Sequence, residues 1–254
     1  MIIRQLPLRR WYQFSKGVGG RSSDFYTMLD RCTPDRFAAI VAQELQRPAP
    51  GELRSLSSIR QYSRRRIPTL EELQNREPNE QTLQWMFLLR GYLQFKHEAI
   101  IERELPISPA GVDREGGLDL LTFDLSRGQP ILVELKRAKA TDSLTGVLLE
   151  VLSHWAFHVR YFHQFRQQLA QSEVVNSLNS MMPTVAIVAP ESYFIETVRR
   201  SSDRRRHHEV QVAAKLINCM RVLYDLQVRF LAIQDDWQQI GLDFVLHDWR
   251  IPAE

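Results

Sequence analysis

The 254-residue chain contains only two cysteines, Cys32 and Cys219, and they lie far apart in the sequence. Their spacing matches neither a metal-binding nor a redox motif, so we expect two reduced, mostly buried thiols, as in a cytoplasmic protein. No stretch approaches the ~20 consecutive apolar residues of a membrane span. The apolar start at Met1–Ile3 is broken at once by Arg4, which is not the pattern of a secretory signal. These features predict a cytoplasmic protein without a membrane partner.

The sequence also lacks internal repeats, low-complexity tracts and a recognisable phosphate-binding loop. The run Gly17–Gly20 has neither the lysine nor the strand–helix context that such a loop requires, so we interpret it as a turn. With a hydrophobic content of 44%, the chain suits one sizeable globular domain, alone or with an appendage.

The charge distribution is uneven, although the formal net charge is only +3. Residues 1–66 carry 13 lysines and arginines against 5 acidic residues, whereas residues 67–254 carry 20 against 25. A basic arm before an acidic core is typical of a chain that binds a phosphate backbone. A solvated, arginine-rich set of helices explains the same asymmetry equally well.

Composition and turn signals divide the chain into two parts. We expect a basic, mostly helical N-terminal region at residues 1–75 and a second domain at residues 76–254. In the first part, residues 37–45 have helical spacing and follow the cap candidates Thr33, Pro34 and Asp35. Thr69 then begins a near capping box, which predicts a further helix start.

The second domain alternates helical and extended patterns. Apolar residues at helical spacing predict helices, and short alternating or continuous apolar runs predict strands. The expected order is helix, three strands, helix and strand, followed by a helix and two more strands, which is an α/β arrangement. The predicted ranges are 80–93, 99–107, the hairpin 118–136, then 143–170, 184–189, 208–222, 223–233 and 240–247.

The hairpin is the most informative segment. Two apolar strands are joined by a tight turn near Gly128, yet they carry Asp119, Glu134 and Lys136 at positions where apolar residues are expected. The period of two places Glu134 and Lys136 on one face of the second strand, with Val133 and Leu135 on the other.

Pairing across this turn brings the charged residues together. A turn centred near Gly128 sets Asp119 opposite roughly position 137, beside Lys136 and diagonal to Glu134. Burying two carboxylates and an ammonium costs free energy unless a bound ligand compensates for their lost hydration. A divalent cation is the ligand that we expect here, and a solvated cross-strand ion cluster is the alternative.

The hairpin resembles the D…(D/E)xK core of the PD-(D/E)XK, or restriction-endonuclease-like, nuclease superfamily. The matching residues are Asp119 and, after fourteen intervening residues, Glu134-Leu135-Lys136. The bare pattern is weak, but the glycine-flanked GGLDLLTFD followed by ILVELKRAK is much more specific. The resemblance covers roughly residues 80–235. It implies an α-β-β-β-α-β core, with a mixed sheet flanked by helices.

The resemblance also implies an activity, the hydrolysis of DNA phosphodiester bonds by a metal-dependent endonuclease. Mg²⁺, with Mn²⁺ as an alternative, would be held by Asp119, Glu134 and the backbone carbonyl of Leu135. Lys136 would orient the attacking water and offset charge in the transition state.

Three further acidic residues are candidates for the same site. Glu104 ends the strand before Asp119 and is the first choice as an additional catalytic residue. Glu102 shares its face by the period of two, so the choice between them is open. Glu80 begins the first helix of the domain, where a solvated N-terminal carboxylate is an equal explanation.

Where many superfamily members carry a glutamine and, four residues later, a tyrosine, this chain has Glu150 and His154. With His158 they form one helical stripe. An acid at position 150 would either add a metal ligand or disturb the site. The two histidines lack a third ligand in the pattern, so helix packing or nucleic-acid contact is favoured over metal binding.

The sequence therefore predicts a cytoplasmic, Mg²⁺-dependent DNA endonuclease. Two rivals remain, a non-catalytic nucleic-acid-binding module that retains the fold and a protein-interaction subunit. The sequence leaves open which nucleic-acid structure is the target and whether it is DNA or RNA. It also leaves open whether the protein forms a homodimer or has a protein partner. The expected nucleic-acid contacts are Arg60, Arg64, Arg65, Arg66, Arg137 and Lys139.

Overall fold

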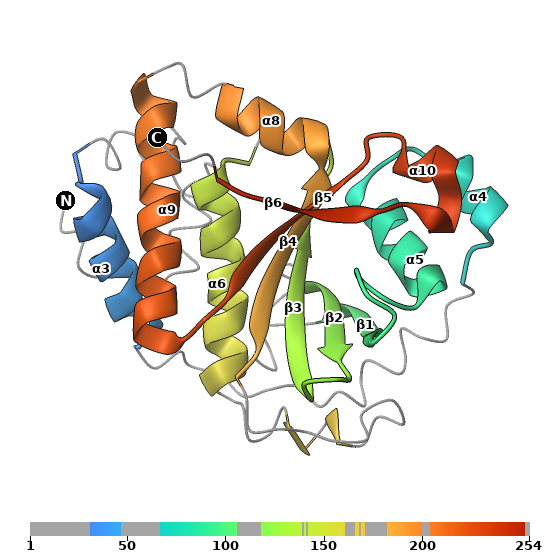
Figure 1. Cartoon of the computed structure of the whole chain (residues 1–254), viewed down its shortest axis with the longest axis horizontal. Helices are drawn as coiled ribbons and strands as arrows, with labels where there is room; N and C mark the ends of the chain where they lie inside the picture. The colour runs from blue at the N-terminus through green and yellow to red at the C-terminus, as the bar shows by residue number, and fades with distance from the viewer. Residues whose placement is uncertain are drawn as a thin grey trace, which may run out of the picture.

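The structure is a computed structural model of the whole chain, in which a six-stranded mixed sheet is flanked by helices on both faces (Figure 1). The α/β class, the mixed sheet and the flanking helices agree with the sequence-based prediction. The residues that it describes are 31–46, 67–105, 118–138, 140, 142–160, 166–167, 169–170, 182–199 and 204–251.

The strands lie in the sheet in chain order, from β1 to β6. The first three form an antiparallel meander, β4 and β5 continue it in parallel with β3, and β6 pairs antiparallel with β5. Their bounds are β1 Glu98–Leu105, β2 Leu118–Asp124, β3 Gln129–Leu135, β4 Thr184–Pro190, β5 Val228–Ile233 and β6 Leu246–Trp249.

Helices cover both faces of this sheet, with α3, α6 and α9 on one side and α4, α5 and α10 on the other (Figure 1). No helix among the described residues is long and apolar enough to cross a bilayer. The bounds are α3 Pro34–Leu45, α4 Leu70–Gln74, α5 Glu80–Arg90, α6 Leu144–Arg160, α8 Glu191–Arg199, α9 Arg204–Tyr224, α10 Trp237–Ile240 and the 3₁₀ helix η4 Gly241–Asp243.

The core consists of two apolar clusters, one on each face of the sheet. Along β3, Leu132 belongs to the cluster under α6 and α9, whereas Val133 and Leu135 belong to the cluster under α4 and α5. This alternation follows from the two-residue period of a strand. It confirms the predicted facing of Val133 and Leu135, and the side chains of Glu134 and Lys136 consequently lie on the α6 side.

Helix starts and stops follow their local signals. Thr33 caps α3, and Thr69 forms a reciprocal capping box with Glu72, as predicted. The predicted helix 80–93 instead ends at Arg90. Gly91 has φ +82° and its amide donates to the Phe87 carbonyl, which closes the helix in a left-handed turn.

The C-terminal part differs from the prediction in three places. The strand expected at 223–233 begins only at Val228, because α9 continues to Tyr224. Helix α8 was not predicted. The strand expected at 240–247 is only Leu246–Trp249, because residues 237–243 are helical. The buried Gln238 amide explains the helical turn, since its Nε2 donates to the carbonyls of Leu73 and Arg76 at 2.6 Å and so docks α10 onto the end of α4.

The N-terminal part contributes directly to the core. Phe37 and Val41 of α3 are buried in the same cluster as α6 and α9, and the Tyr224 hydroxyl donates to the Ala42 carbonyl at 3.1 Å. The boundary near residue 75 stays a prediction. Both cysteines are free thiols, Cys32 buried and Cys219 partly buried.

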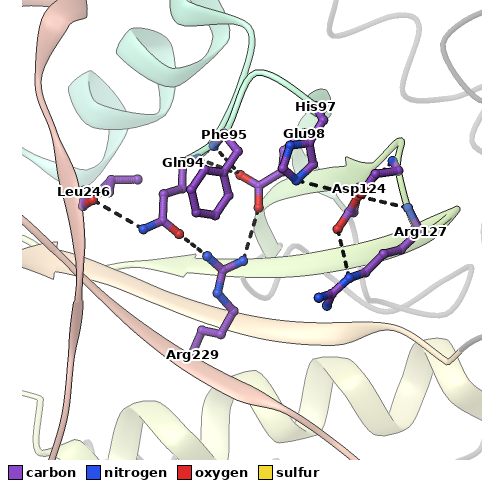
Figure 2. Close-up of polar contacts among 9 residues, drawn as sticks. Gln94, Phe95, His97, Glu98, Asp124, Arg127, Arg229 and Leu246 are labelled. Atoms are coloured by element: carbon purple, nitrogen blue, oxygen red, sulfur yellow. Dashed lines mark hydrogen bonds and ion pairs between the residues drawn. The ribbon is translucent and has the colours of Figure 1, made fainter.

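A polar network ties β1, β5 and the loop after α5 together (Figure 2). One oxygen of the buried Glu98 carboxylate accepts from the amides of Gln94 and Phe95 at 2.7 and 2.9 Å. The other oxygen accepts from Arg229 at 3.1 Å, and Arg229 also donates to the Gln94 side chain. Glu98 therefore satisfies two loop amides and one cation at once.

We expect Glu98→Ala to lower the free energy of unfolding by about 2–3 kcal/mol, because it leaves two amides and a guanidinium without their acceptor. Urea unfolding monitored by circular dichroism measures this loss. Glu77→Ala, at an exposed glutamate, should change stability by less than about 0.5 kcal/mol. An equally small effect at Glu98 would contradict the role assigned to the network.

Candidate metal centre and active site

The candidate site lies where β3 ends against α6. Glu134 and Lys136 are almost fully buried there, with exposed fractions of 3% and 2%. The Lys136 ammonium donates to Glu134 Oε1 at 2.7 Å and to Glu150 Oε2 at 2.8 Å, and Asp142 Oδ2 lies 3.9 Å away. The lysine is therefore held between carboxylates from β3 and from α6.

The register of β2 and β3 places Asp119 beside Glu134 rather than opposite position 137. Leu120 pairs with Val133, so the next step along both strands aligns Asp119 with Glu134. The predicted register was wrong because the turn is centred before Gly128.

The position of the turn has a local cause. Asp124 pairs with Gln129, and Asp124 Oδ1 accepts from the amides of Ser126 and Arg127 and from the Ser126 hydroxyl. These bonds hold the chain in an Asx-type turn directly after β2.

Both oxygens of the Asp119 carboxylate have a donor. Oδ2 accepts from the Leu135 amide at 2.7 Å, and Oδ1 accepts from Gln84 Nε2 at 2.7 Å. The Lys136 amide instead donates to Val188 of β4. Because the N–H and C=O of one strand residue point to the same side, the Leu135 carbonyl lies on the Asp119 side of β3.

Gln84 of α5 belongs to this arrangement, although it was missing from the sequence-based set. Its Oε1 accepts from Arg103 at 3.3 Å, and the Arg103 guanidinium stacks 3.7 Å above the Trp85 ring. Gln84 and Arg103 are both buried. The detectable signal was a polar residue one turn after Glu80 within an otherwise apolar helix stretch.

Charge at the site is strongly unbalanced. Three carboxylates (Glu134, Asp142 and Glu150) lie within 3.9 Å of the Lys136 ammonium, and the carboxylates of Asp119 and Glu80 add negative charge nearby. Burial raises the pKa of Asp119 to about 7, against the lowering effect of Lys136. Burial, followed by repulsion from Asp119 and Glu150, raises the pKa of Glu134 well above its ordinary value. A bound cation would relieve this repulsion.

The donor set fits a metal ion. Glu134 Oε2 is buried and makes no hydrogen bond among the described residues. Ligand atoms of Glu134, Glu150 and His154 all lie within 4.8 Å of one another. The structure therefore brings both α6 residues, Glu150 and His154, to the end of β3, where the sequence had left their role open.

The other residues predicted for the site lie partly near Asp119, partly at the surface and partly outside the described residues. Glu80 is close enough for its carboxylate to raise the pKa of Asp119. Glu102 is partly buried and accepts from the Arg103 amide at 3.0 Å. Arg137 is exposed next to Lys136. The described residues do not include the Glu104 side chain, Lys139, or the arginines at 60, 64, 65 and 66.

Comparison with protein-family models, with curated proteins and with solved structures gives no match for this chain. The function is therefore argued from the chemistry of the site.

We expect Gln84→Leu to lower Mg²⁺-dependent activity by about 10- to 100-fold, mainly through a weaker apparent affinity for the cation. The substitution keeps the side-chain volume but removes the donor that orients Asp119 Oδ1. Activity measured over a Mg²⁺ series separates the apparent metal affinity from the rate at saturation.

Gln129→Leu is the matched control for this experiment. Gln129 is also buried and donates one hydrogen bond, to the Met182 carbonyl, but it lies at the turn end of the hairpin. It should lose stability without a change in metal dependence. Equal metal dependence in the two variants would remove Gln84 from the site.

Proposed function

We propose that this protein is a divalent-metal-dependent nuclease that hydrolyses phosphodiester bonds in DNA through a restriction-endonuclease-like core. The observation that carries the proposal is the convergence of Asp119, Glu134 and Lys136 at the end of β3, with the Leu135 amide bonded to Asp119. Carboxylates, a backbone carbonyl and a lysine within one site are the parts that phosphodiester hydrolysis with a metal requires.

The order of elements supports the same proposal. Helix α5, strands β1 to β3, helix α6 and strand β4 follow the α-β-β-β-α-β order, and β4 is parallel to β3. This order sets the start of β2 beside the end of β3, and α6 packs against β3 and β4 close to the polar residues.

Mg²⁺, or Mn²⁺, would be held by Asp119, Glu134 and the Leu135 carbonyl. Hard oxygen donors suit these ions, and the buried Glu134 Oε2, which makes no hydrogen bond among the described residues, fits a ligand role. When bound, the cation lowers the pKa of a coordinated water and neutralises charge on the phosphate.

The chain's own residues supply the rest of the chemistry. Lys136, which contacts Glu134 and Glu150, would orient the attacking water and stabilise the charge that develops on the phosphate oxygens. Gln84 fixes the Asp119 carboxylate. Arg137 and the predicted basic arm would contact the DNA backbone.

The test is incubation of the purified full chain with plasmid, linear and branched DNA in Mg²⁺, in Mn²⁺ and in EDTA. Cleavage that requires the cation and is absent in Asp119→Asn supports the proposal. Salt-sensitive DNA binding without cleavage would instead select the non-catalytic binding module. If the protein neither binds nor cleaves DNA, the protein-interaction subunit is the remaining alternative.

A further inference from the structure

A buried cation lies behind the candidate metal site, on the far side of Gln84 from Asp119. Arg103 of β1 is 3% exposed, and its Nη1 donates to Gln84 Oε1 at 3.3 Å. Gln84 Nε2 in turn donates to Asp119 Oδ1 at 2.7 Å. Two hydrogen bonds therefore join β1, α5 and β2, and the second of them ends on a predicted metal ligand.

The chemistry of the two partners allows only one orientation of the Gln84 amide. A guanidinium has only N–H donors, and an ionised carboxylate has only acceptors. The amide must therefore turn its oxygen to Arg103 and its nitrogen to Asp119. The last side-chain torsion of glutamine has no strong preference of its own. Without Arg103, a half-turn about this bond would present the Gln84 oxygen to Asp119 and remove the donor.

Stacking holds the guanidinium in this position. It lies 3.7 Å above the ring of Trp85, which is 6% exposed and follows Gln84 in α5. A planar cation stacked on a ring keeps its N–H groups in its own plane, where they reach acceptors beside the ring. Gln84 Oε1 is such an acceptor, so the stack and the hydrogen bond together fix Arg103.

An irregularity in β1 brings Arg103 to this face of the sheet. The register of β1 against β2 shifts by one residue between Ile100 and Glu102. After the shift Arg103 pairs with Leu120, which belongs to the apolar cluster under α4 and α5. Without the extra residue Glu102 would pair with Leu120, and a carboxylate would face α5 in place of the cation. A β-bulge beside an active site commonly re-aims a side chain in this way.

We propose that Arg103 is a positioning residue that fixes the Gln84 amide and thereby keeps a hydrogen-bond donor on Asp119 Oδ1. The inference rests on the proposed nuclease site and deepens it, because it assigns the support behind one metal ligand. Each carboxylate oxygen has two lone pairs, so Asp119 Oδ1 can accept from Gln84 and still bind a cation. A ligand that is already oriented binds a metal more tightly.

A double-mutant cycle on Mn²⁺ affinity tests whether Arg103 acts through Gln84. The affinity is measured on the full-length protein without DNA, from the free-ion signal in electron paramagnetic resonance. We expect Arg103→Met to weaken Mn²⁺ binding by about 3- to 10-fold, less than the loss of a residue that bonds the ligand itself. In the Gln84→Leu background the same substitution should change the affinity by less than about twofold. Equal effects in the two backgrounds would overturn the proposal.

The orientation of the amide can be read without metal or DNA, by nuclear magnetic resonance of protein labelled with ¹⁵N in the glutamine side chains. The Gln84 signal is identified by its loss in Gln84→Leu. In EDTA at pH 8, where Asp119 is mostly ionised, one of its N–H protons should be shifted downfield by the bond to the carboxylate. This shift should collapse in Arg103→Met. An unchanged Gln84 signal in folded Arg103→Met would overturn the proposal.

Arg103→Gln is the second variant, for the case that Arg103→Met does not fold. A glutamine at this position can donate or accept, so it no longer imposes one orientation on Gln84. The downfield shift should therefore decrease in this variant as well, and a full wild-type shift would contradict the positioning role.

Arg229→Met is the matched control. Arg229 is also a strand arginine that donates to a glutamine side chain, that of Gln94, but it belongs to the network around Glu98 at the turn end of the hairpin (Figure 2). Its loss should lower stability without a change in Mn²⁺ affinity or in the Gln84 signal. The same changes in Arg229→Met as in Arg103→Met would indicate a general loss of packing and would overturn the proposal.

The positioning role and the nuclease fail separately, because neither the amide signal nor Mn²⁺ binding requires cleavage. A Gln84 shift that collapses in Arg103→Met, in a protein that cleaves no DNA, would refute the nuclease alone. DNA cleavage together with an unchanged Gln84 signal in Arg103→Met would refute the positioning role alone.

Discussion

Asp119→Asn and Glu134→Gln should each reduce Mg²⁺-dependent DNA cleavage by at least about a thousandfold, because each removes a charged ligand worth several kcal/mol to the transition state. Both substitutions keep the shape of the side chain, so the fold should persist. Cleavage rates at saturating Mg²⁺, with circular dichroism as a check on folding, measure the effect.

The metal-free protein should respond in the opposite direction. The pKa of Asp119 is about 7 in the folded chain against 3.8 for the ordinary group. The charged form is therefore disfavoured by folding, and this destabilisation is present above pH 7 and is lost as the pH falls toward 4. The substitution also removes one of the two oxygens that accept hydrogen bonds, at every pH. The melting temperature of Asp119→Asn in EDTA, relative to the wild type, should therefore be higher by a few degrees at pH 8 than at pH 5.

The difference in melting temperature between the wild type and Asp119→Asn reports the titration of Asp119 alone, because other titrating groups are present in both proteins. Burial lowers the pKa of His158 to about 4, which makes the folded chain less stable as the pH falls below 6.5, and this contribution is common to both proteins. Asp243→Asn, at an exposed aspartate in η4, is the matched control and should change neither stability nor cleavage. Wild-type cleavage by a folded Asp119→Asn or Glu134→Gln protein would contradict the metal assignment.

Lys136→Met should lower the cleavage rate by about 10²- to 10³-fold while Mg²⁺ binding is kept or strengthened. The lysine acts on water and phosphate, and its removal takes a positive charge away from the cation position. Lys136→Arg should restore little activity, since a planar guanidinium cannot replace a compact ammonium between Glu134 and Glu150.

Lys136→Met should also show how much the buried carboxylates destabilise the fold when no cation is present. Without Lys136, Glu134 and Glu150 lose their shared cation, and the metal-free protein should lose about 3–5 kcal/mol of stability. Mg²⁺ should then raise the melting temperature more in Lys136→Met than in the wild type. Arg137→Met, one residue further and exposed, is the control. Loss of Mg²⁺ affinity in Lys136→Met, measured by calorimetry, would show that the lysine supports the metal rather than the chemistry.

The strands and the long helices could be predicted because their signals are local. The hairpin at 118–136 and the helices at 143–170 and 208–222 follow from apolar periodicity. They coincide with β2, β3 and α9, and α6 covers the first part of the range 143–170. Helix α10 could not be predicted in this way. Its stability depends on Gln238 donating to carbonyls of α4, about 160 residues earlier in the chain.

The sequence by itself determined which charged residues would meet at the hairpin, because pairing across a short turn is a local constraint. It placed Asp119 near Glu134 and Lys136 even though the register was shifted by three positions, an error caused by the Asp124 turn bonds. Helical periodicity likewise put Glu150 and His154 on one face. Only the tertiary structure decided that this face meets Glu134, and that Gln84 of α5 holds Asp119. Those contacts depend on how α5 and α6 pack on opposite faces of the sheet, and packing of distant apolar surfaces leaves no short-range pattern in the chain.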